Sequence, residues 1–250
     1  MEQNAKTPIM LIIPDVHGRM FWRTAIRLYP DLPTIFLGDY LDPYTYLDGT
    51  LPSEALCEFR DILQYKKENR DRVTLLLGNH DVHYFDPKYN CSRKDWMYQE
   101  VIADLFFKNL SLFKLTELID VEDKKLLFSH AGIIPRWMKL HFHKVRLSDP
   151  ERLSNLLNEQ LHDPDKFKEF VINALMDCSA SRGGKAKYPS ILWADVEDHR
   201  TLRHRLPNVY QIFGHTQQES GPVITDHYAN LDCRKAFLLM DDGEIEQIPM

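Results

Sequence analysis

Aspartate, asparagine and histidine side chains occupy five short turns, each of which follows an apolar run in the sequence. Carboxylate and imidazole groups together suit Mn²⁺, Fe²⁺ or Zn²⁺, and the lack of thiols beside the turns argues against a structural zinc site. The pattern therefore predicts a metal centre with oxygen and nitrogen ligands. The turns are Asp-Val-His-Gly at 15–18, Gly-Asp-Tyr-Leu-Asp-Pro at 38–43, Gly-Asn-His-Asp at 78–81, His-Ala-Gly at 130–132 and Gly-His-Thr at 214–216.

The elements that precede the turns must bring them together. Apolar runs at 8–13, 34–37 and 73–77 have the length of buried strands, and helical spacing begins at Met20 and at Ser53. This alternation of strand and helix favours parallel pairing in an α/β fold. The carboxyl ends of parallel strands form a binding crevice, so we expect the first three turns to meet there.

The second half of the chain has a different pattern. Residues 116–121 and 124–128 form a predicted hairpin, and a further strand is expected at 208–213. These last two runs lead into His130 and His215, so both histidines are expected in the same crevice.

Residues from about 134 to 190 are predicted to be a helical insert that caps the site, within a single domain that spans 1–250. Helix N-caps are expected at Ser53, Ser148 and Asp163, and residues 92–109 are also predicted to be helical.

The composition excludes several classes of protein. The 250 residues include 44% hydrophobic and 27% charged residues, which is typical of a soluble globular chain. The formal net charge of −6 gives no general basic field for nucleic acid. The apolar run at 9–13 is too short to span a membrane, and the four cysteines form no Cys-x-x-Cys pair. We therefore expect a cytoplasmic protein without nucleic-acid or membrane partners.

Together the five turns resemble the motifs of the calcineurin-like metallophosphoesterase superfamily. Within it, they are similar to the branch that contains phosphoprotein phosphatases and symmetrical diadenosine tetraphosphatases. The resemblance implies a layered α/β/β/α sandwich that binds two divalent metal ions, expected to be Mn²⁺ or Fe²⁺, with Zn²⁺ as the alternative. It implies that Asp15 and His17 bind the first metal, that Asp39 bridges, and that Asn79, His130 and His215 bind the second.

The same resemblance implies the catalytic roles. Two ions about 3.5–4 Å apart can be bridged by a hydroxide, which attacks phosphorus. His80 would be the general acid that protonates the leaving oxygen, and Asp42 would orient His80. Many relatives have a second histidine where this chain has Gln217, which favours the phosphoprotein phosphatase branch.

One position departs from the pattern of that branch. The motif at 38–43 usually continues with an arginine that binds substrate phosphate, and this chain has Pro43 there. Proline supplies neither a guanidinium nor a backbone donor, so either another cation must serve or the substrate is held differently. The candidates are Arg136, Arg182, Arg200, Arg203 and Arg205.

The substrate remains open at this point. The leading interpretation is a phosphomonoester, with phosphoserine and phosphothreonine as candidates, so the partner would be a phosphorylated small molecule, nucleotide or phosphoprotein. The alternative enzyme is a dinucleoside polyphosphate hydrolase. A non-catalytic binding protein is the third hypothesis. It is disfavoured because such a protein should have lost ligand residues, and this chain keeps every ligand residue that the resemblance implies.

Overall fold

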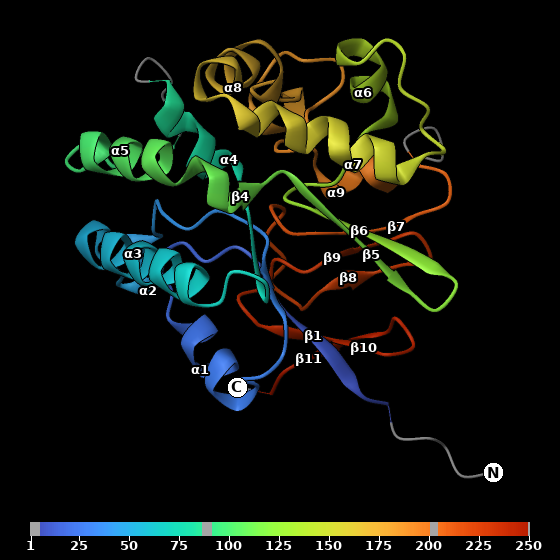
Figure 1. The fold of residues 1–250 in the computed structure, drawn as a ribbon. Coiled ribbons are helices and arrows are strands. Elements are labelled where there is room, and N and C mark those ends of the chain that lie inside the picture. Colours follow the sequence, from blue (N-terminus) through green and yellow to red (C-terminus); the bar gives the residue numbers. More distant parts are fainter. Residues whose placement is uncertain (1–5, 87–91, 201–204, 250) are drawn as a thin grey trace.

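A computed structural model describes residues 6–86, 92–200 and 205–249 (Figure 1). The described residues form two β-sheets that pack face to face, with helices on both outer sides. This arrangement confirms the predicted layered α/β/β/α fold. Between the sheets lies an apolar layer to which Ile12, Ile35 and Leu76 contribute from one sheet and Phe128 and Ile212 from the other.

The first sheet has the strand order β11-β10-β1-β2-β3-β4. Strands β1 to β3 are parallel, as predicted. Strand β4, which was not expected from the sequence, pairs in parallel with β3, whereas β10 and β11 run antiparallel at the other edge. The strands are β1 (Pro8–Ile13), β2 (Thr34–Phe36), β3 (Val73–Leu76), β4 (Phe113–Lys114), β10 (Phe237–Met240) and β11 (Ile245–Gln247).

The second sheet has the order β5-β6-β7-β9-β8. Strands β5 and β6 form the predicted hairpin, and β7 pairs in parallel with both β6 and β9. The strands are β5 (Thr116–Val121), β6 (Lys124–Ser129), β7 (Tyr210–Phe213), β8 (Val223–Ile224) and β9 (Tyr228–Asn230).

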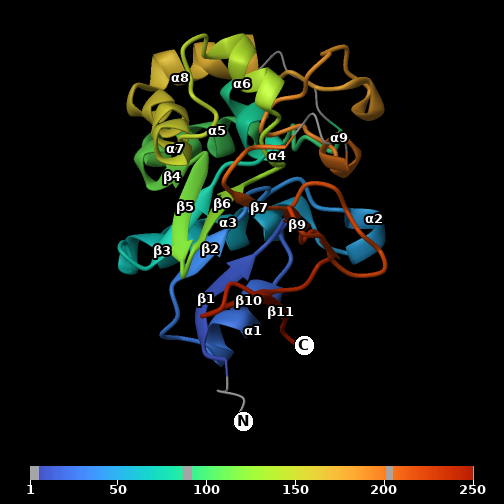
Figure 2. The ribbon, with the colours of Figure 1, turned by 90° about the vertical axis from the view of Figure 1, so that its right-hand side faces the viewer.

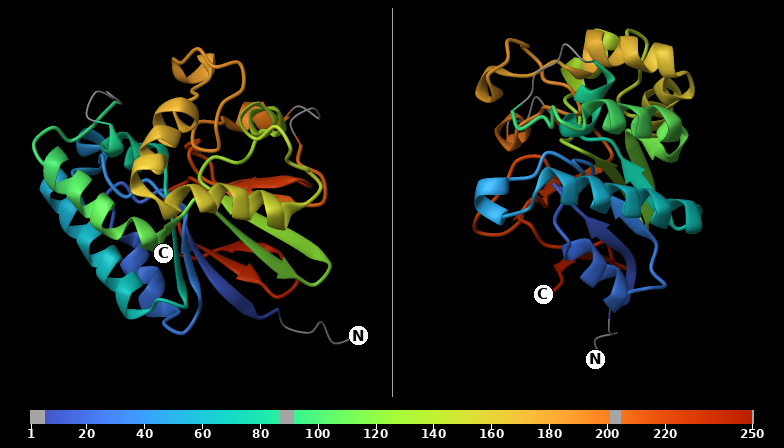
Figure 3. Two further views of the ribbon diagram at one scale, coloured as in Figure 1. Left: turned by 45° about the horizontal axis from the view of Figure 1, so that its top comes forward. Right: turned by 90° about the vertical axis from the view of Figure 1, so that its left-hand side faces the viewer.

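Continuous apolar runs form the central strands because both faces of the first sheet are covered. Leu11 and Ile13 face the helices, whereas Ile12 faces the second sheet. Helices α1 (Phe21–Leu28), α3 (Pro52–Glu68) and α5 (Gln99–Asn109) lie side by side on the outer face (Figure 3). A strand buried on both faces has no polar side to alternate with, which explains the unbroken runs.

The region predicted as an insert contains α6 (Pro135–His141), α7 (Pro150–Asn158) and α8 (Pro164–Phe170). These helices lie together at one end of the sheets, opposite α1 (Figure 2). The region shares its core with the first half of the chain, since the rings of Phe85 and Phe167 are 5.0 Å apart. The assignment of a single domain remains a prediction. Short helices α2 (Thr45–Asp48), α4 (Asn79–Val82) and α9 (Val196–Arg200) complete the described elements.

Two predicted helix N-caps are wrong, by two residues for α3 and by one residue for α7. Helix α3 begins at Pro52 and α7 at Pro150, because proline at the first helical position has a preset φ and needs no hydrogen-bond acceptor. The side chain of Asp149, rather than Ser148, accepts from the backbone N–H of Arg152 at 3.0 Å. The predicted cap at Asp163 is confirmed.

Helix α5 is shorter than the predicted 92–109. The carboxylate of Asp95 accepts from the backbone N–H groups of Met97 and Tyr98, which holds that segment in a turn until Gln99. Among the described residues, no helix is both long and apolar enough to cross a membrane.

Candidate metal centre

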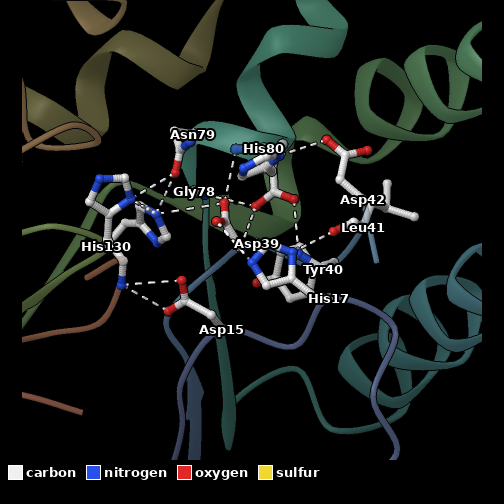
Figure 4. A network of polar contacts seen from close by, with 12 residues as sticks. Asp15, His17, Asp39, Tyr40, Leu41, Asp42, Gly78, Asn79, His80 and His130 are labelled. Atoms are coloured by element: carbon white, nitrogen blue, oxygen red, sulfur yellow. Dashed lines mark hydrogen bonds and ion pairs between the residues drawn. The ribbon is translucent and has the colours of Figure 1, made fainter. Parts of the chain in front are cut away.

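Every predicted metal-site side chain lies just beyond the carboxyl end of a strand. Asp15 and His17 follow β1, Asp39 follows β2, and Asn79 begins α4 directly after β3. From the second sheet, His130 follows β6 and His215 follows β7. The structure brings all six together, and Figure 4 shows Asp15, His17, Asn79 and His130 around Asp39. The crevice is therefore formed by both sheets rather than by one.

The turns that carry the site have unusual backbone geometry. His17, Asp39, Asp42 and His215 have φ values of 46°, 53°, 57° and 66°. Such left-handed conformations cost a residue with a side chain about 1–3 kcal/mol. All four strained residues belong to the turns of one crevice. This indicates that the fold holds their side chains in particular directions at a cost in local stability.

Two glycines allow the turns to approach closely. A Cβ atom on Gly78 would lie 2.1 Å from Asp39 Oδ1, and one on Gly214 would lie 2.1 Å from Asp15 Oδ1. Each distance is far inside van der Waals contact. These glycines are therefore required because a carboxylate of the site packs directly on the backbone of the neighbouring turn.

Asp15, His17 and Asp39 form the first cluster, in which one potential ligand atom from each lies within 4.8 Å of the others. The ring of His17 is oriented by its Nδ1 atom, which lies 2.7 Å from the carbonyl oxygen of Leu41. This bond leaves Nε2 facing the cluster, 3.5 Å from Asp39 Oδ2. A hydrogen bond from the second ring nitrogen is the usual way in which proteins orient a metal-binding histidine.

Asp39, His130 and His215 form the second cluster, and the Asn79 side chain joins it. His130 Nδ1 lies 2.8 Å from the carbonyl oxygen of Leu37, so its Nε2 faces inward. That Nε2 lies 3.2 Å from His215 Nδ1, and both nitrogens lie 2.9 Å from Asn79 Oδ1. Three electron-pair donors at such distances fit a shared cation.

Burial dominates the electrostatics of the crevice. It lowers the pKa of His17 to about 3 and also lowers the pKa values of His130 and His215. The three imidazoles are therefore neutral at pH 7 and keep a lone pair each. Burial and the charge of Asp39 raise the pKa of Asp15 well above its ordinary value. A bound cation would relieve this cost, so the donor set fits divalent metal ions.

The His80 imidazole lies beside the clusters and is held by Asp42. His80 Nδ1 is 2.8 Å from Asp42 Oδ2, as the resemblance implies. Asp42 also contacts His83 Nε2 at 2.9 Å and accepts a hydrogen bond from the Tyr84 hydroxyl at 2.5 Å. Burial raises the pKa of Asp42, but the hydrogen bonds from His80 and His83 outweigh it and hold that pKa below the usual range. Asp42 therefore stays ionised and fixes the His80 ring.

Sequence reasoning gave no role to Asp81, the last residue of the Gly-Asn-His-Asp turn. Its buried carboxylate accepts from the backbone N–H groups of Gly78 at 2.7 Å, Asp39 at 2.8 Å and Tyr40 at 3.1 Å. Asp81 therefore joins the turn after β2 to the turn after β3. Its position three residues after a glycine at a helix start is a signal that could have identified it.

Replacing Asp81 with alanine is expected to lower the free energy of unfolding by on the order of 3–5 kcal/mol, because three buried donors lose their acceptor. Urea denaturation in the presence of a chelator measures this loss without a contribution from metal. Asp81→Asn retains one acceptor oxygen and should lose less. An alanine variant within about 1 kcal/mol of the wild type would contradict this role.

Arg93 is the second residue that the sequence did not reveal. It lies in the turn before α5 with a φ of 66°. Its Nη1 donates to the carbonyl oxygen of Asp42 at 2.7 Å, and its Nη2 lies 3.0 Å from His80 Nε2. The guanidinium therefore lies beside His80 and lines the same cavity as Pro43. No local sequence pattern identifies this residue, because the direction of its side chain is set by the turn in which it lies and not by its spacing in the sequence.

The arginines predicted to bind phosphate lie at varied positions. Arg182 is the nearest to the site, and it donates to Asp195 Oδ2 and to the Thr216 hydroxyl, both at 2.8 Å. Arg136 donates to the Tyr188 hydroxyl at 2.8 Å on the surface. Three other arginines complete the set: Arg200 is exposed and pairs with Glu197, Arg205 contacts His227, and Arg203 lies outside the described residues.

Comparisons with known proteins agree with this geometry. The description of the family model that matches residues 10–219 is calcineurin-like phosphoesterase. The chain is 32% identical over 133 residues to a symmetrical bis(5'-nucleosyl)-tetraphosphatase of Klebsiella pneumoniae (strain 342) and 38% identical over 133 residues to that of Salmonella arizonae. Each match covers 50% of this chain but only 44% of the relative.

Two solved structures share the fold. A cold-active protein tyrosine phosphatase superposes with a TM-score of 0.55 at 17% identity, over 96% of this chain and 78% of the other. A protein serine/threonine phosphatase from Saccharomyces cerevisiae superposes with a TM-score of 0.54 at 15% identity, over 96% and 79%. The family resemblance predicted from the five turns is confirmed, and the chain belongs to the calcineurin-like phosphoesterase family.

Proposed function

We propose that this chain is a two-metal phosphoesterase. One observation carries the proposal: two buried clusters of potential metal ligands share the single carboxylate of Asp39. When bound, the two ions would activate water for attack on phosphorus and neutralise charge on the phosphoryl oxygens. The remaining steps depend on groups of the chain itself.

The proposed ligands follow from the two clusters. Asp15 and His17 hold one ion, and Asn79, His130 and His215 hold the other, as described above. Asp39 contributes to both. Mixed oxygen and imidazole ligands suit Mn²⁺ or Fe²⁺, with Zn²⁺ as the alternative. We propose the cytoplasm as the location of this activity, on the composition of the chain.

His80 is the proposed general acid. Because its Nδ1 faces Asp42, the Nε2 atom is the one that can deliver a proton to the leaving oxygen. Arg93 lies 3.0 Å from that Nε2. Phosphate oxygens are stronger acceptors for a guanidinium than a neutral imidazole, so bound substrate would draw Arg93 away and free Nε2 for its proton.

A phosphomonoester is the leading substrate, and phosphoserine and phosphothreonine peptides are the first candidates. The alternative, a dinucleoside polyphosphate, is supported by the similarity to symmetrical bis(5'-nucleosyl)-tetraphosphatases, although the match spans less than half of their length. A parallel assay of the manganese-loaded chain with a phosphopeptide and with diadenosine tetraphosphate separates the two. Phosphate release is measured for the phosphopeptide, and the nucleotide products are measured for diadenosine tetraphosphate. Hydrolysis of neither substrate, nor of a generic aryl phosphate, would contradict the proposed function.

Replacing Arg93 with alanine is expected to lower kcat/KM roughly 10- to 100-fold, mainly through a higher KM, since charge-assisted hydrogen bonds to phosphate are lost. Steady-state kinetics and the inhibition constant of inorganic phosphate measure the change. Arg93→Lys keeps the charge and should recover part of the loss. Arg152→Ala is the matched control, since Arg152 is an exposed arginine that pairs with Glu159. The role fails if Arg93→Ala stays within twofold of wild type.

A further inference from the structure

A cavity of about 370 Å³ opens beside Arg93. We propose that this cavity binds the leaving group of the substrate and that it selects a leaving group with an aromatic ring. The inference rests on the proposed phosphoesterase activity and adds the substrate class. The lining residues used in the argument are Pro43, Tyr44, Tyr46, Leu47, Pro52 and Arg93.

Arg93 connects the cavity to the reacting atoms. Its Nη2 lies 3.0 Å from His80 Nε2, the atom that would protonate the leaving oxygen. Its guanidinium carbon also lies 3.5 Å from the ring centroid of Tyr44. The cavity therefore begins at Arg93, on the side of the proposed general acid. A group that departs toward His80 would enter it.

The wall of the cavity nearest the metals is fixed. The Tyr44 ring packs edge-on against the imidazole of His17, with centroids 5.1 Å apart. The guanidinium carbon of Arg19 lies 5.2 Å from the centroid of the same tyrosine ring. A tyrosine that contacts two arginines and a proposed metal-binding histidine has little freedom to move. It therefore provides a preformed aromatic surface beside the phosphate.

The outer wall consists of apolar side chains that the core does not use. Tyr46 has a relative exposure of 104% and Leu47 one of 70%, and both belong to the four-residue helix α2. Apolar groups gathered at the mouth of a cavity commonly mark a ligand site.

The chemistry of the lining defines the class of ligand. Tyrosine rings and a guanidinium both stack on flat aromatic rings, whereas two prolines and a leucine exclude water from their edges. Such a lining recognises the shape of a ring rather than its hydrogen-bonding pattern. The preferred substrate is therefore a phosphomonoester whose leaving group carries an aromatic ring, either the ring of a phenol or the base of a nucleoside.

The test compares three substrates with the manganese-loaded full chain: O-phosphotyrosine, adenosine 5'-monophosphate and O-phosphoserine. The double variant Tyr46→Ser, Leu47→Ser is expected to raise KM about tenfold for an aromatic substrate and to leave KM for phosphoserine unchanged. A larger increase for phosphotyrosine assigns the ring to a phenol, and a larger increase for the nucleotide assigns it to a nucleoside. For each substrate, the KM of the double variant is divided by the KM of the wild type. Differences in leaving-group acidity between substrates therefore cancel.

Leu140→Ser is the matched control, because Leu140 is a similarly exposed leucine on α6. Equal changes for all three substrates, or no change for any, would overturn the leaving-group cavity while the phosphoesterase activity stands. Phosphate release from none of the substrates by the wild type would overturn the proposed function, and this inference with it.

Discussion

Replacing His80 with alanine is expected to lower turnover of an alkyl phosphate roughly 10²–10⁴-fold while both metal equivalents stay bound. The loss reflects the missing proton donor, since an alkoxide is a poor leaving group. Metal is retained because His80 bonds to Asp42 and belongs to neither of the clusters that share Asp39. Single-turnover kinetics and metal analysis of the same sample measure both effects.

The leaving group supplies an internal control for this variant. With a nitrophenyl ester, whose phenolate departs without a proton, the loss should shrink toward tenfold or less. His143→Ala, which removes an exposed histidine in the predicted insert, should leave turnover unchanged. Unchanged turnover of the alkyl ester in His80→Ala would exclude this histidine as the general acid.

Asp39→Ala should lower bound metal from two equivalents to less than one and reduce turnover to the background rate. Asp39 is the only residue common to both proposed metal clusters in the described part of the chain, so its loss weakens each. It also accepts the backbone N–H of His80 at 2.9 Å, so the general acid moves as well. Metal analysis after gel filtration gives the stoichiometry.

Stability must be followed in the same experiment. Thermal unfolding of the metal-free proteins shows whether the variant folds, and Asp104→Ala, which removes an exposed aspartate on α5, is the matched control. Two full equivalents of metal in a folded Asp39→Ala variant would remove the bridging role.

The convergence of the candidate metal ligands could be predicted because strand ends impose their geometry. Once 8–13, 34–37 and 73–77 are buried parallel strands, the residues that follow them must lie at one edge of the sheet. Asp15, Asp39 and Asn79 meet for that reason. The left-handed backbone at Asp39 could not be predicted, since aspartate rarely adopts it without the support that Asp81 supplies from another turn.

Arg93 could not be predicted because its position depends on tertiary structure alone. It is 51 residues from Asp42, whose carbonyl oxygen accepts its hydrogen bond, and no periodicity connects them. The predicted helix over 92–109 would have carried Arg93 away from this position. The hydrogen bonds from Met97 and Tyr98 to Asp95 stop that helix, so a local turn determines where the cation lies.

The capping errors have a simpler cause. Ser148 is a good N-cap in isolation, but the neighbouring Asp149 accepts a hydrogen bond more strongly and precedes a proline. Competition between adjacent residues shifts a helix boundary by one position without affecting the site.

Anomalous diffraction from crystals grown with Mn²⁺ tests whether Asp39 joins two metal sites. Two manganese peaks about 3.5–4 Å apart are expected, with one oxygen of Asp39 in contact with each or shared between both. His17 Nε2 should contact one ion, and His130 Nε2 and His215 Nδ1 the other, since these atoms already face the clusters. A single peak, or two peaks that do not contact Asp39, would contradict the bridging role.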